Sequence, residues 1–382
     1  MRPPLVVAGI IIAAVIAGVA YWAGTQSGDD NSNVMTQTTG ATSATGVTTD
    51  TGTTGVTSTT EDTSTTDISA AEDLTGLNLT VYTAKGYSQP SIKKDLQDIK
   101  TLGSTSVTLV PTWYMPQANS NTVMPRPGKT PTDGSLKVAI TWAHEAGLKV
   151  VLKPHVDVND ESFRGEIQPA DHVLWFQAYD AMMTHYAALA ANNGVDVFSV
   201  GTELKTMSGD TDSFKSLIDK VRARYSGKMT YAANWDEYDQ VQFWDSLDYI
   251  GVDAYYPLSS PGQTPSVDDL VNAWQTPLSS LKSLSDKWGK PIVFTEIGYP
   301  TQADAAAHPY EVVKGQPEDQ GAQATAYEAA FRAFADQEWF KGMSWWSWRG
   351  DPGQNEDLSI DYTPQGKKAE SILADGQGGT RP

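Results

Sequence analysis

The sequence has no cysteine among its 382 residues. This absence excludes a thiol nucleophile, a disulfide framework, a cysteine-containing metal site and a lipid anchor attached to cysteine. It does not decide the redox compartment, because an exported protein can also lack cysteine. A chain of this length can bury a sizeable core without cross-links, as one large domain or two ordinary ones.

Basic residues are scarce: 27 lysines and arginines stand against 46 aspartates and glutamates, for a formal net charge of −19. A surface that binds nucleic acid needs clustered Lys and Arg, so the balance argues against a nucleic-acid partner and for a soluble, acidic surface. Aromatic residues are abundant, with 12 Trp and 16 Tyr. Many belong to the core, but a surplus also suits a cleft that stacks sugars.

The first 24 residues predict an export segment. Leu5 to Ala23 is uncharged and apolar, follows Arg2, and is long enough to cross a bilayer, which takes about 20 residues. Two forms stay open: an uncleaved anchor with its amino end in the cytoplasm, or a signal peptide cleaved after the small residues Gly18 to Ala20. In either form the rest of the chain is expected outside the cell, membrane-anchored or secreted.

Residues 25–71 consist largely of Thr, Ser and Gly, with almost no large apolar side chain. Such a segment cannot bury a core, which predicts a disordered linker. Its threonine content resembles O-glycosylated stalks, although composition leaves glycosylation open. A short disordered tail is predicted at the other end, over residues 376–382.

Between residues 72 and 375, short apolar runs alternate with amphipathic segments. The segment 91–103 shows the helical pattern, with Ile92, Leu96 and Ile99 on one stripe and Gly103 as a stop. Similar segments cover residues 135–148, 172–194, 213–227, 237–247, 267–289, 320–337 and 363–373. Strands are predicted at 77–82, 106–111, 149–154, 195–201, 229–234, 249–255, 291–296 and 342–348.

Eight strands that alternate with helices over about 300 residues predict an α/β protein with a single (β/α)8 TIM barrel. A doubly wound sheet is the alternative. It usually has fewer strands, and no glycine-rich phosphate loop follows the first strand here.

Chemistry in a (β/α)8 barrel takes place where the strands end, at the carboxyl-terminal face. Carboxylates and aromatic residues gather at those positions in this sequence. They are Trp113 and Tyr114 after the second strand; Lys153, His155 and Asp157 after the third; Thr202 and Glu203 after the fourth; Asn234, Trp235, Asp236 and Glu237 after the fifth; Asp253, Tyr255 and Tyr256 after the sixth; Glu296 and Tyr299 after the seventh; and Trp345, Trp346, Trp348 and Arg349 after the eighth.

Two carboxylates on opposite sides of a pocket are what glycoside hydrolysis requires, one as proton donor and one as nucleophile or base. Strands four and seven lie roughly across a barrel from each other, so Glu203 and Glu296 can flank one cleft. The alternative for either glutamate is a structural ion pair with Lys153 or Arg349.

Other residues also have structural alternatives. His155 could be a structural histidine, Asp157 and Asp253 could hold neighbouring groups, and Trp113 and Trp235 could belong to the core. Of the tryptophans in the eighth strand, Trp345 or Trp348 is expected to line the cleft, and Trp346 to pack outward. Asp236 and Glu237 have no further ligand at metal-binding spacing, so no metal is expected.

The segments "FSVGTELK" (198–205) and "PIVFTEIGYP" (291–300) resemble the acid/base and nucleophile motifs of clan A glycoside hydrolases, which are retaining (β/α)8 enzymes. Within that clan the chain looks most like glycoside hydrolase family 113, a family of β-mannanases. The resemblance covers about residues 75–373 and none of the first 70. It also includes the segments "KGYSQPSIKKDLQDIKTLG", "VVLKPHVDV", "GMSWWSWRGDP" and "YTPQGKKAE".

The resemblance implies Glu203 as general acid/base and Glu296 as nucleophile. It implies a floor under the reacting sugar from Trp345 or Trp348, a hydrogen bond to the nucleophile from Tyr255 or Tyr256, and contacts from Lys153 and His155 to sugar hydroxyls. Many clan A enzymes have Asn before the acid/base, where it contacts the sugar 2-hydroxyl; this chain has Thr202. Mannose carries that hydroxyl axially, so the change is compatible with mannan and weakens a glucan or xylan assignment by analogy. Trp113, Asn234 and Trp235 complete the expected substrate-binding set.

The sequence thus predicts an extracellular, monomeric, retaining glycoside hydrolase of β-linked polysaccharide, above all an endo-β-1,4-mannanase, with no metal or organic cofactor. Xylan, β-glucan or a cell-wall glycan are alternative substrates. A rival of another class is a surface carbohydrate-binding protein without catalysis, which would keep the aromatic residues but would not need both glutamates. Cleft length, and with it endo or exo action, is not fixed by these motifs.

Overall fold

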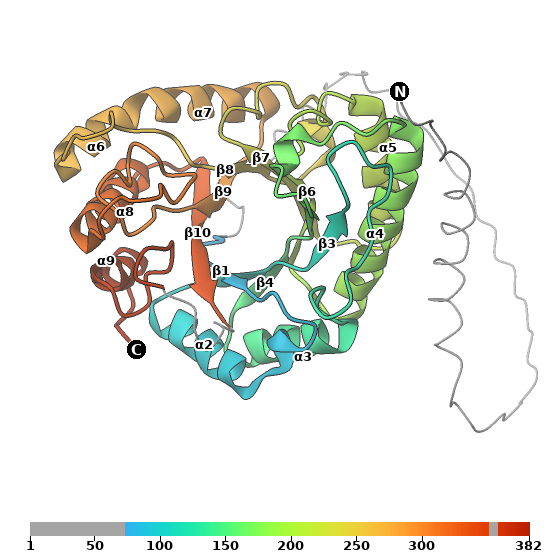
Figure 1. The fold of residues 1–382 in the computed structure, drawn as a ribbon, viewed down its shortest axis with the longest axis horizontal. Helices are drawn as coiled ribbons and strands as arrows, with labels where there is room; N and C mark the ends of the chain where they lie inside the picture. The colour runs from blue at the N-terminus through green and yellow to red at the C-terminus, as the bar shows by residue number, and fades with distance from the viewer. Residues whose placement is uncertain (1–72, 351–357) are drawn as a thin grey trace, which may run out of the picture. The chain divides into compact units, whose positions relative to one another are not determined.

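The computed structural model describes residues 73–350 and 358–382. In this part of the chain eight parallel strands close into a barrel, seen as a ring in Figure 1. Each strand pairs with the next along the chain and the last pairs with the first, which confirms the predicted (β/α)8 barrel. In order they are β1 (Gly76–Thr80), β2 (Ser106–Leu109), β4 (Lys149–Leu152), β6 (Val197–Thr202), β7 (Lys228–Asn234), β8 (Ile250–Asp253), β9 (Ile292–Ile297) and β10 (Phe340–Arg349).

The strands are short and apolar because both of their faces are covered. β9 has the sequence IVFTEI, and all 6 of its residues are buried. One face of a barrel strand fills the interior and the other packs against helices, so continuous apolar runs are expected in place of strict alternation. The position of Glu296 in this buried strand therefore requires partners for its charge.

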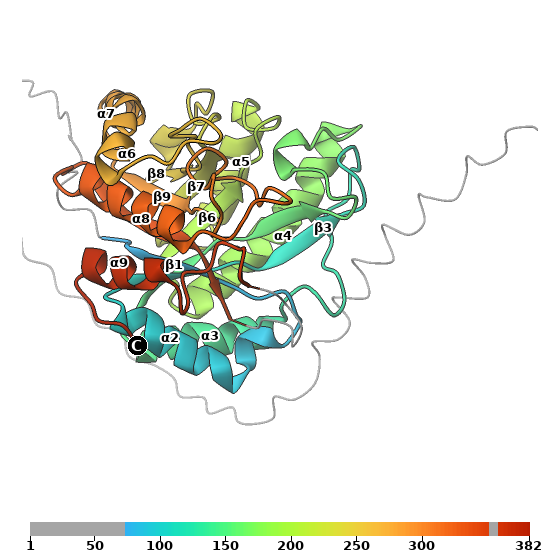
Figure 2. The ribbon, with the colours of Figure 1, turned by 60° about the vertical axis from the view of Figure 1, so that its left-hand side comes forward.

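Helices surround the barrel in both views (Figures 1 and 2). Several begin where a side chain caps free backbone N–H groups; the side chain of Asp171, for example, accepts from Leu174 N at the start of α4. They are α2 (Pro90–Thr101), α3 (Asp133–Glu145), α4 (His172–Asn192), α5 (Thr211–Arg222), α6 (Val267–Ala273), α7 (Gln275–Trp288), α8 (Gln320–Phe334) and α9 (Lys368–Gln377).

Two helical predictions need correction. Residues 267–289 form two helices, α6 and α7, that meet at the buried Trp274. Pro277 lies in the first turn of α7 and has no N–H to donate back into α6, so one continuous helix would lose a bond there. Residues 237–247 contain only a 3-10 turn, η4 (Trp244–Ser246).

A small second sheet was not predicted. β3 (Thr112–Met115) and β5 (His155–Val158) follow β2 and β4 and pair in parallel beyond the barrel. Pro111 and Pro154 separate them from the barrel strands, because proline cannot donate to the ladder. The paired strands place the residues that follow β4 in a regular structure next to the barrel end.

The carboxyl-terminal segment is ordered, so the predicted disordered tail over residues 376–382 is wrong. α9 continues to Gln377, Thr380 N donates to Thr101 O at 2.8 Å, and Arg381 pairs with Glu370 at 2.9 Å. The first contact fastens the chain end to α2, and the second fastens it to α9. The predicted export segment and linker, residues 1–71, lie outside the described residues; within the described ranges no helix is long and apolar enough to span a bilayer.

Candidate active site

Glu296 lies at the end of β9 and is 3% exposed. Lys153 Nζ donates to its Oε1 at 2.5 Å, and the hydroxyl of Tyr255 donates to its Oε2 at 2.6 Å. A buried carboxylate needs such charge-assisted bonds to offset the loss of water. Both oxygens are thus held in place by donors from two other strand ends.

Lys153 is fully buried and also donates to Thr295 O at 3.2 Å. The structure therefore places its ammonium group on the predicted nucleophile, whereas the resemblance implied contacts to sugar hydroxyls. His155, at the start of β5, has Nε2 3.5 Å from Glu296 Oε1, and this nitrogen has no hydrogen-bond partner among the described residues. Burial lowers the pKa of His155 well below its ordinary value, with smaller contributions from Arg164 and Lys153, so the ring is neutral.

Glu203 follows β6 and is 6% exposed. Its φ of 52° is left-handed, which is uncommon for a residue with a side chain. Burial raises the pKa of Glu203 to about 7; the Arg164 guanidinium opposes this and the charge of Glu296 adds to it. The two glutamates therefore interact electrostatically.

Tyr255 and Tyr256, which both follow β8, have different surroundings. Tyr255 bonds to Glu296, whereas Tyr256 packs against Trp235 and Trp274 with ring centroids 5.6 and 5.4 Å apart. Of the two alternatives, the structure thus places Tyr255 on the predicted nucleophile. Burial, followed by the charge of Glu296, raises the pKa of Tyr255 well above its ordinary value, so it remains a donor.

Asp253, the last residue of β8, is fully buried and is the partner of Glu296 in the register of β8 against β9. It accepts a hydrogen bond from Thr295 Oγ1 at 2.6 Å. Burial raises its pKa well above the ordinary carboxyl value, and the charge of Glu296 adds to the effect. It is a supporting group, consistent with one of the alternatives expected from the sequence.

Three further predicted residues lie at the ends of β6 and β7. Thr202 is buried, and its Oγ1 has no partner among the described residues. Asn234 Oδ1 accepts from the backbone N–H of Trp235 at 2.9 Å. Trp235 is half-buried. All three are neighbours of Glu203 in sequence or in strand order.

The three other predicted tryptophans contact residues outside this group, which favours the core alternative for Trp113 and places neither Trp345 nor Trp348 beside the glutamates. Trp345 is fully buried and stacks on Tyr327 of α8, with centroids 3.8 Å apart. Trp348 is buried and donates from Nε1 to Asp95 of α2 at 3.1 Å. Trp113 donates to the hydroxyl of Tyr186 on α4 at 2.9 Å. Their indole rings serve the packing of helices against strands.

Trp346 takes the place expected of Trp345 or Trp348. It is half-buried and stacks on the His155 ring, with ring centroids 5.9 Å apart and an interplanar angle of 8°. Lys153 Nζ lies 5.7 Å from the centroid of the Trp346 ring. The expectation was wrong for Trp346 because the face of each tryptophan does not follow from position in β10: the register of this strand shifts against β9 between Met343 and Trp345.

Two more residues of the group were missed as site residues. Arg164, in the 3-10 turn η3 (Arg164–Glu166), donates from Nη1 to Glu203 Oε2 at 2.6 Å. Tyr362 packs edge-on against Tyr255 at 6.3 Å, and after burial the charges of Glu296, Glu311 and Glu203 raise its pKa. Neither residue follows a barrel strand directly, so no pattern at the strand ends marks them in the sequence.

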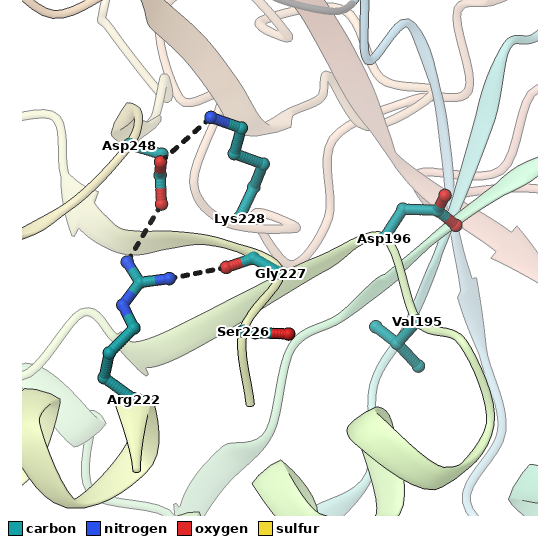
Figure 3. Close-up of a pocket in the computed structure, with 7 residues that line it drawn as sticks. All are labelled: Val195, Asp196, Arg222, Ser226, Gly227, Lys228 and Asp248. Atoms are coloured by element: carbon teal, nitrogen blue, oxygen red, sulfur yellow. Dashed lines mark hydrogen bonds and ion pairs between the residues drawn. The ribbon is translucent and has the colours of Figure 1, made fainter. Parts of the chain in front are cut away.

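Within residues 73–350 and 358–382, no cluster of three or more His, Asp or Glu side chains could hold a metal ion. A hollow of about 320 Å³ lies elsewhere, among Val195, Asp196, Arg222, Ser226, Gly227, Lys228 and Asp248 (Figure 3). These residues adjoin the amino-terminal ends of β6, β7 and β8, opposite the glutamates. Its two cations both bind Asp248, at 3.0 and 3.1 Å, so neither is left unpaired for an anionic ligand.

The chain is similar to known glycoside hydrolases in both sequence and fold. The sequence profile of Glycoside Hydrolase Family 113 matches residues 80–367. No curated protein matches the chain. A GH113 β-mannanase, AaManA from Alicyclobacillus acidocaldarius in complex with ManMIm, is 28% identical, with a TM-score of 0.74 over 81% of this chain and 99% of that one. A complex structure of a GH113 β-1,4-mannanase is 25% identical, with the same TM-score and coverage.

Proposed function

The chain belongs to glycoside hydrolase family 113, and from this premise we propose that it is a retaining endo-hydrolase of β-1,4-mannan. The observation that carries the proposal is the contrast between its two site glutamates. Glu296 is held by an ammonium group and a phenol, while the buried Glu203 has its pKa raised to about 7. One carboxylate ready to attack and one acid ready to give a proton are the two components of this reaction.

In the first step an oxygen of the Glu296 carboxylate forms a bond to the anomeric carbon. The bond from that carbon to the glycosidic oxygen breaks, and its electron pair leaves with the oxygen, which takes the proton of Glu203. The products are a glycosyl ester of Glu296 and a shortened chain. As the negative charge of Glu296 is lost to the ester, its hydrogen bonds from Tyr255 and Lys153 weaken.

In the second step Glu203, now ionised, takes a proton from water. The water oxygen bonds to the anomeric carbon, and the ester bond breaks to restore the Glu296 carboxylate. Two inversions at one carbon give net retention. The mechanism requires a separation of about 5–5.5 Å between the two carboxyl groups in the complex with substrate, against about 6.5–9.5 Å for an inverting enzyme.

The assignment of mannan is supported by the β-mannanases among the solved relatives and by Thr202. Its buried, unpartnered hydroxyl precedes the acid/base, at the position from which a clan A enzyme contacts the sugar 2-hydroxyl. A buried hydroxyl without a partner is costly, so a ligand hydroxyl that bonds to it gains that free energy. We assign the axial 2-hydroxyl of mannose to this position.

The test is a panel of polymers, β-1,4-mannan, xylan and mixed-linkage β-glucan, followed by sizing of the products. We expect mannan to be cut into a range of oligosaccharides, as endo action requires. Release of single sugars only would replace endo with exo action. Preferred cleavage of xylan or β-glucan would overturn the substrate, and binding without any cleavage would point to a carbohydrate-binding protein.

We also propose that the enzyme acts outside the cell. Residues 1–24 either anchor it to the membrane or are cleaved off as a signal peptide. The support is the apolar run from Leu5 to Ala23 after Arg2. Fractionation of the source cells, with sequencing of the amino end of the mature protein, tests this. Recovery of the full-length protein in the cytosol would contradict it.

A further inference from the structure

Arg164 joins the carboxylate of Glu203 to β5. Its Nη1 donates to Glu203 Oε2 at 2.6 Å, its Nη2 to Asp157 Oδ1 at 2.6 Å, and its Nε to Val156 O at 3.1 Å. The planar guanidinium is thus fixed on one side by a carboxylate and a carbonyl of β5. Its remaining edge points at Glu203, in the fork geometry that makes Arg suited to orienting carboxylates.

The turn that carries Arg164 is itself attached to the chain after Glu203. Thr206 N donates to Gly165 O at 3.2 Å, and the Thr206 hydroxyl donates to Ile167 O. The ring of Phe163 lies against Gly165, where an added Cβ would come within 2.3 Å of it. These contacts keep the turn and the segment that follows Glu203 in one arrangement, so the guanidinium and the carboxylate are held together from both sides.

Only one oxygen of Glu203 is engaged by this contact. Oε2 accepts from Arg164, and among the described residues no hydrogen bond reaches Oε1. Oε1 is therefore the oxygen left to exchange a proton with a glycosidic oxygen or a water. A glutamate side chain that is free to rotate could present either oxygen. The bond from Arg164 to Oε2 therefore fixes Oε1 as the oxygen that faces the proton donor or acceptor.

The charged and titratable groups around Glu203 come from several elements. Arg164 favours its ionised form, as does the more distant Lys153, while Glu296 and burial disfavour it. Asp253 of β8 and Tyr362 respond in turn to the charge of Glu203. Among the described residues, Arg164 is the one cation hydrogen-bonded to it.

We propose that Arg164 is a positioning residue for the acid/base: it holds Oε2 so that protons pass through Oε1, and its charge makes Glu203 a stronger acid. The inference rests on the proposed role of Glu203. A stronger acid assists departure of a poor leaving group, such as a sugar hydroxyl, more than that of a good one. The same charge stabilises the Glu203 carboxylate through the life of the glycosyl ester, until water gives it a proton.

The test compares Arg164→Met with Arg164→Lys and with Arg222→Met, a matched loss of one arginine charge at the opposite end of the barrel. In Arg164→Met the alkaline limb of the kcat/KM profile should move up by about 1–3 pH units, since that is the range over which a neighbouring arginine lowers a carboxyl pKa. Arg164→Lys keeps the charge without the fork and should lie between. Arg222→Met should match the wild type.

Two further measurements separate this role from a structural one. The loss in kcat/KM of Arg164→Met should be large for mannooligosaccharides and small for an aryl β-mannoside with an activated leaving group. Without any substrate, the carboxyl titration of Glu203, taken as the infrared difference between each protein and its Glu203→Gln derivative, should shift upward in Arg164→Met.

The outcomes distinguish this inference from the proposed function. If the wild type cleaves mannan, but Arg164→Met folds normally and both its alkaline limb and its Glu203 titration are unchanged, the role of Arg164 is overturned and the function stands. If the Glu203 titration shifts as expected while the wild type cleaves no β-glycan, the coupling stands and the proposed function fails.

Discussion

At the scale of single residues, the two glutamates differ in what surrounds them. Glu296 receives a cation and a hydroxyl on separate oxygens, whereas Glu203 receives one arginine against the effect of deep burial. The sequence was sufficient to single out both glutamates, because each ends an apolar strand. It could not identify Arg164, since its contact depends on a turn whose position only the folded chain defines.

Glu296→Gln tests the nucleophile. An amide of nearly the same shape cannot attack the anomeric carbon, so turnover of mannan should fall by about 10⁴–10⁶-fold while substrate still binds. Steady-state kinetics and calorimetric titration measure the two effects. Glu145→Gln, on the exposed face of α3, is the control and should keep wild-type activity. Turnover near the wild-type rate in Glu296→Gln would remove Glu296 from this role.

The raised pKa of Glu203 predicts the alkaline side of the activity profile. The carboxyl must be protonated to act as acid, so kcat/KM should decline as the pH rises through about 7. A pH profile on soluble mannooligosaccharides measures this. A decline that begins only several pH units higher would show that another group controls it.

The same shift predicts a change in stability with pH. Folding raises the pKa of this carboxyl, so its contribution to stability is present below its ordinary value near 4.5 and is lost as the pH rises to about 7. The free energy of unfolding of Glu203→Gln, relative to the wild type, should therefore increase between pH 5 and pH 8. Denaturant unfolding at both pH values measures this change. The variant lacks the ion pair with Arg164 at both pH values. No relative change between the two pH values would contradict the shift.

At the scale of elements, the eight barrel strands were predictable from their apolar runs, but their details were not. Strand β10 carries three tryptophans, and the sequence did not show which of them faces the site. The register shift beside Met343 is a property of its pairing with β9, which no local pattern records. The sheet formed by β3 and β5 was missed for a similar reason, since segments of 4 residues become strands only through their partner.

The tryptophans of β10 give a matched pair of variants. Trp345→Ala should lower the free energy of unfolding by about 3–5 kcal/mol, because it removes a fully buried ring stacked on Tyr327. Trp346→Ala should lower the free energy of unfolding much less. It should instead lower kcat/KM, because its half-buried ring stacks on His155 beside Glu296. Denaturant unfolding and kinetics on both variants measure this. The reverse pattern would restore Trp345 to the site.

At the scale of the whole molecule, the two ends of the barrel differ in what they carry. The chain enters at the amino-terminal ends of the strands, where Leu74 N bonds to Lys341 O, while Glu203 and Glu296 lie at the carboxyl-terminal ends. The fold class and this division of labour followed from the sequence, because strand count and strand ends are local features. The ordered chain end was not predicted, because its bond to α2 joins residues far apart in the sequence.

Removal of residues 1–69 should therefore leave catalysis intact. The cut falls before Asp73, whose carboxylate accepts from Thr75 N at 2.9 Å at the end of the barrel away from the glutamates. We expect kcat/KM on soluble mannooligosaccharides within about twofold of the full chain. A loss of tenfold or more in a folded product would show that the removed segment contributes to the site.

The central claim is that Glu203 and Glu296 act together in a double displacement. The most direct test is proton NMR of the anomeric signals during the first minutes of mannooligosaccharide hydrolysis, before mutarotation mixes the products. The mechanism predicts that the β anomer appears first and the α anomer follows slowly. Initial appearance of the α anomer would contradict it, because a single displacement inverts the anomeric carbon.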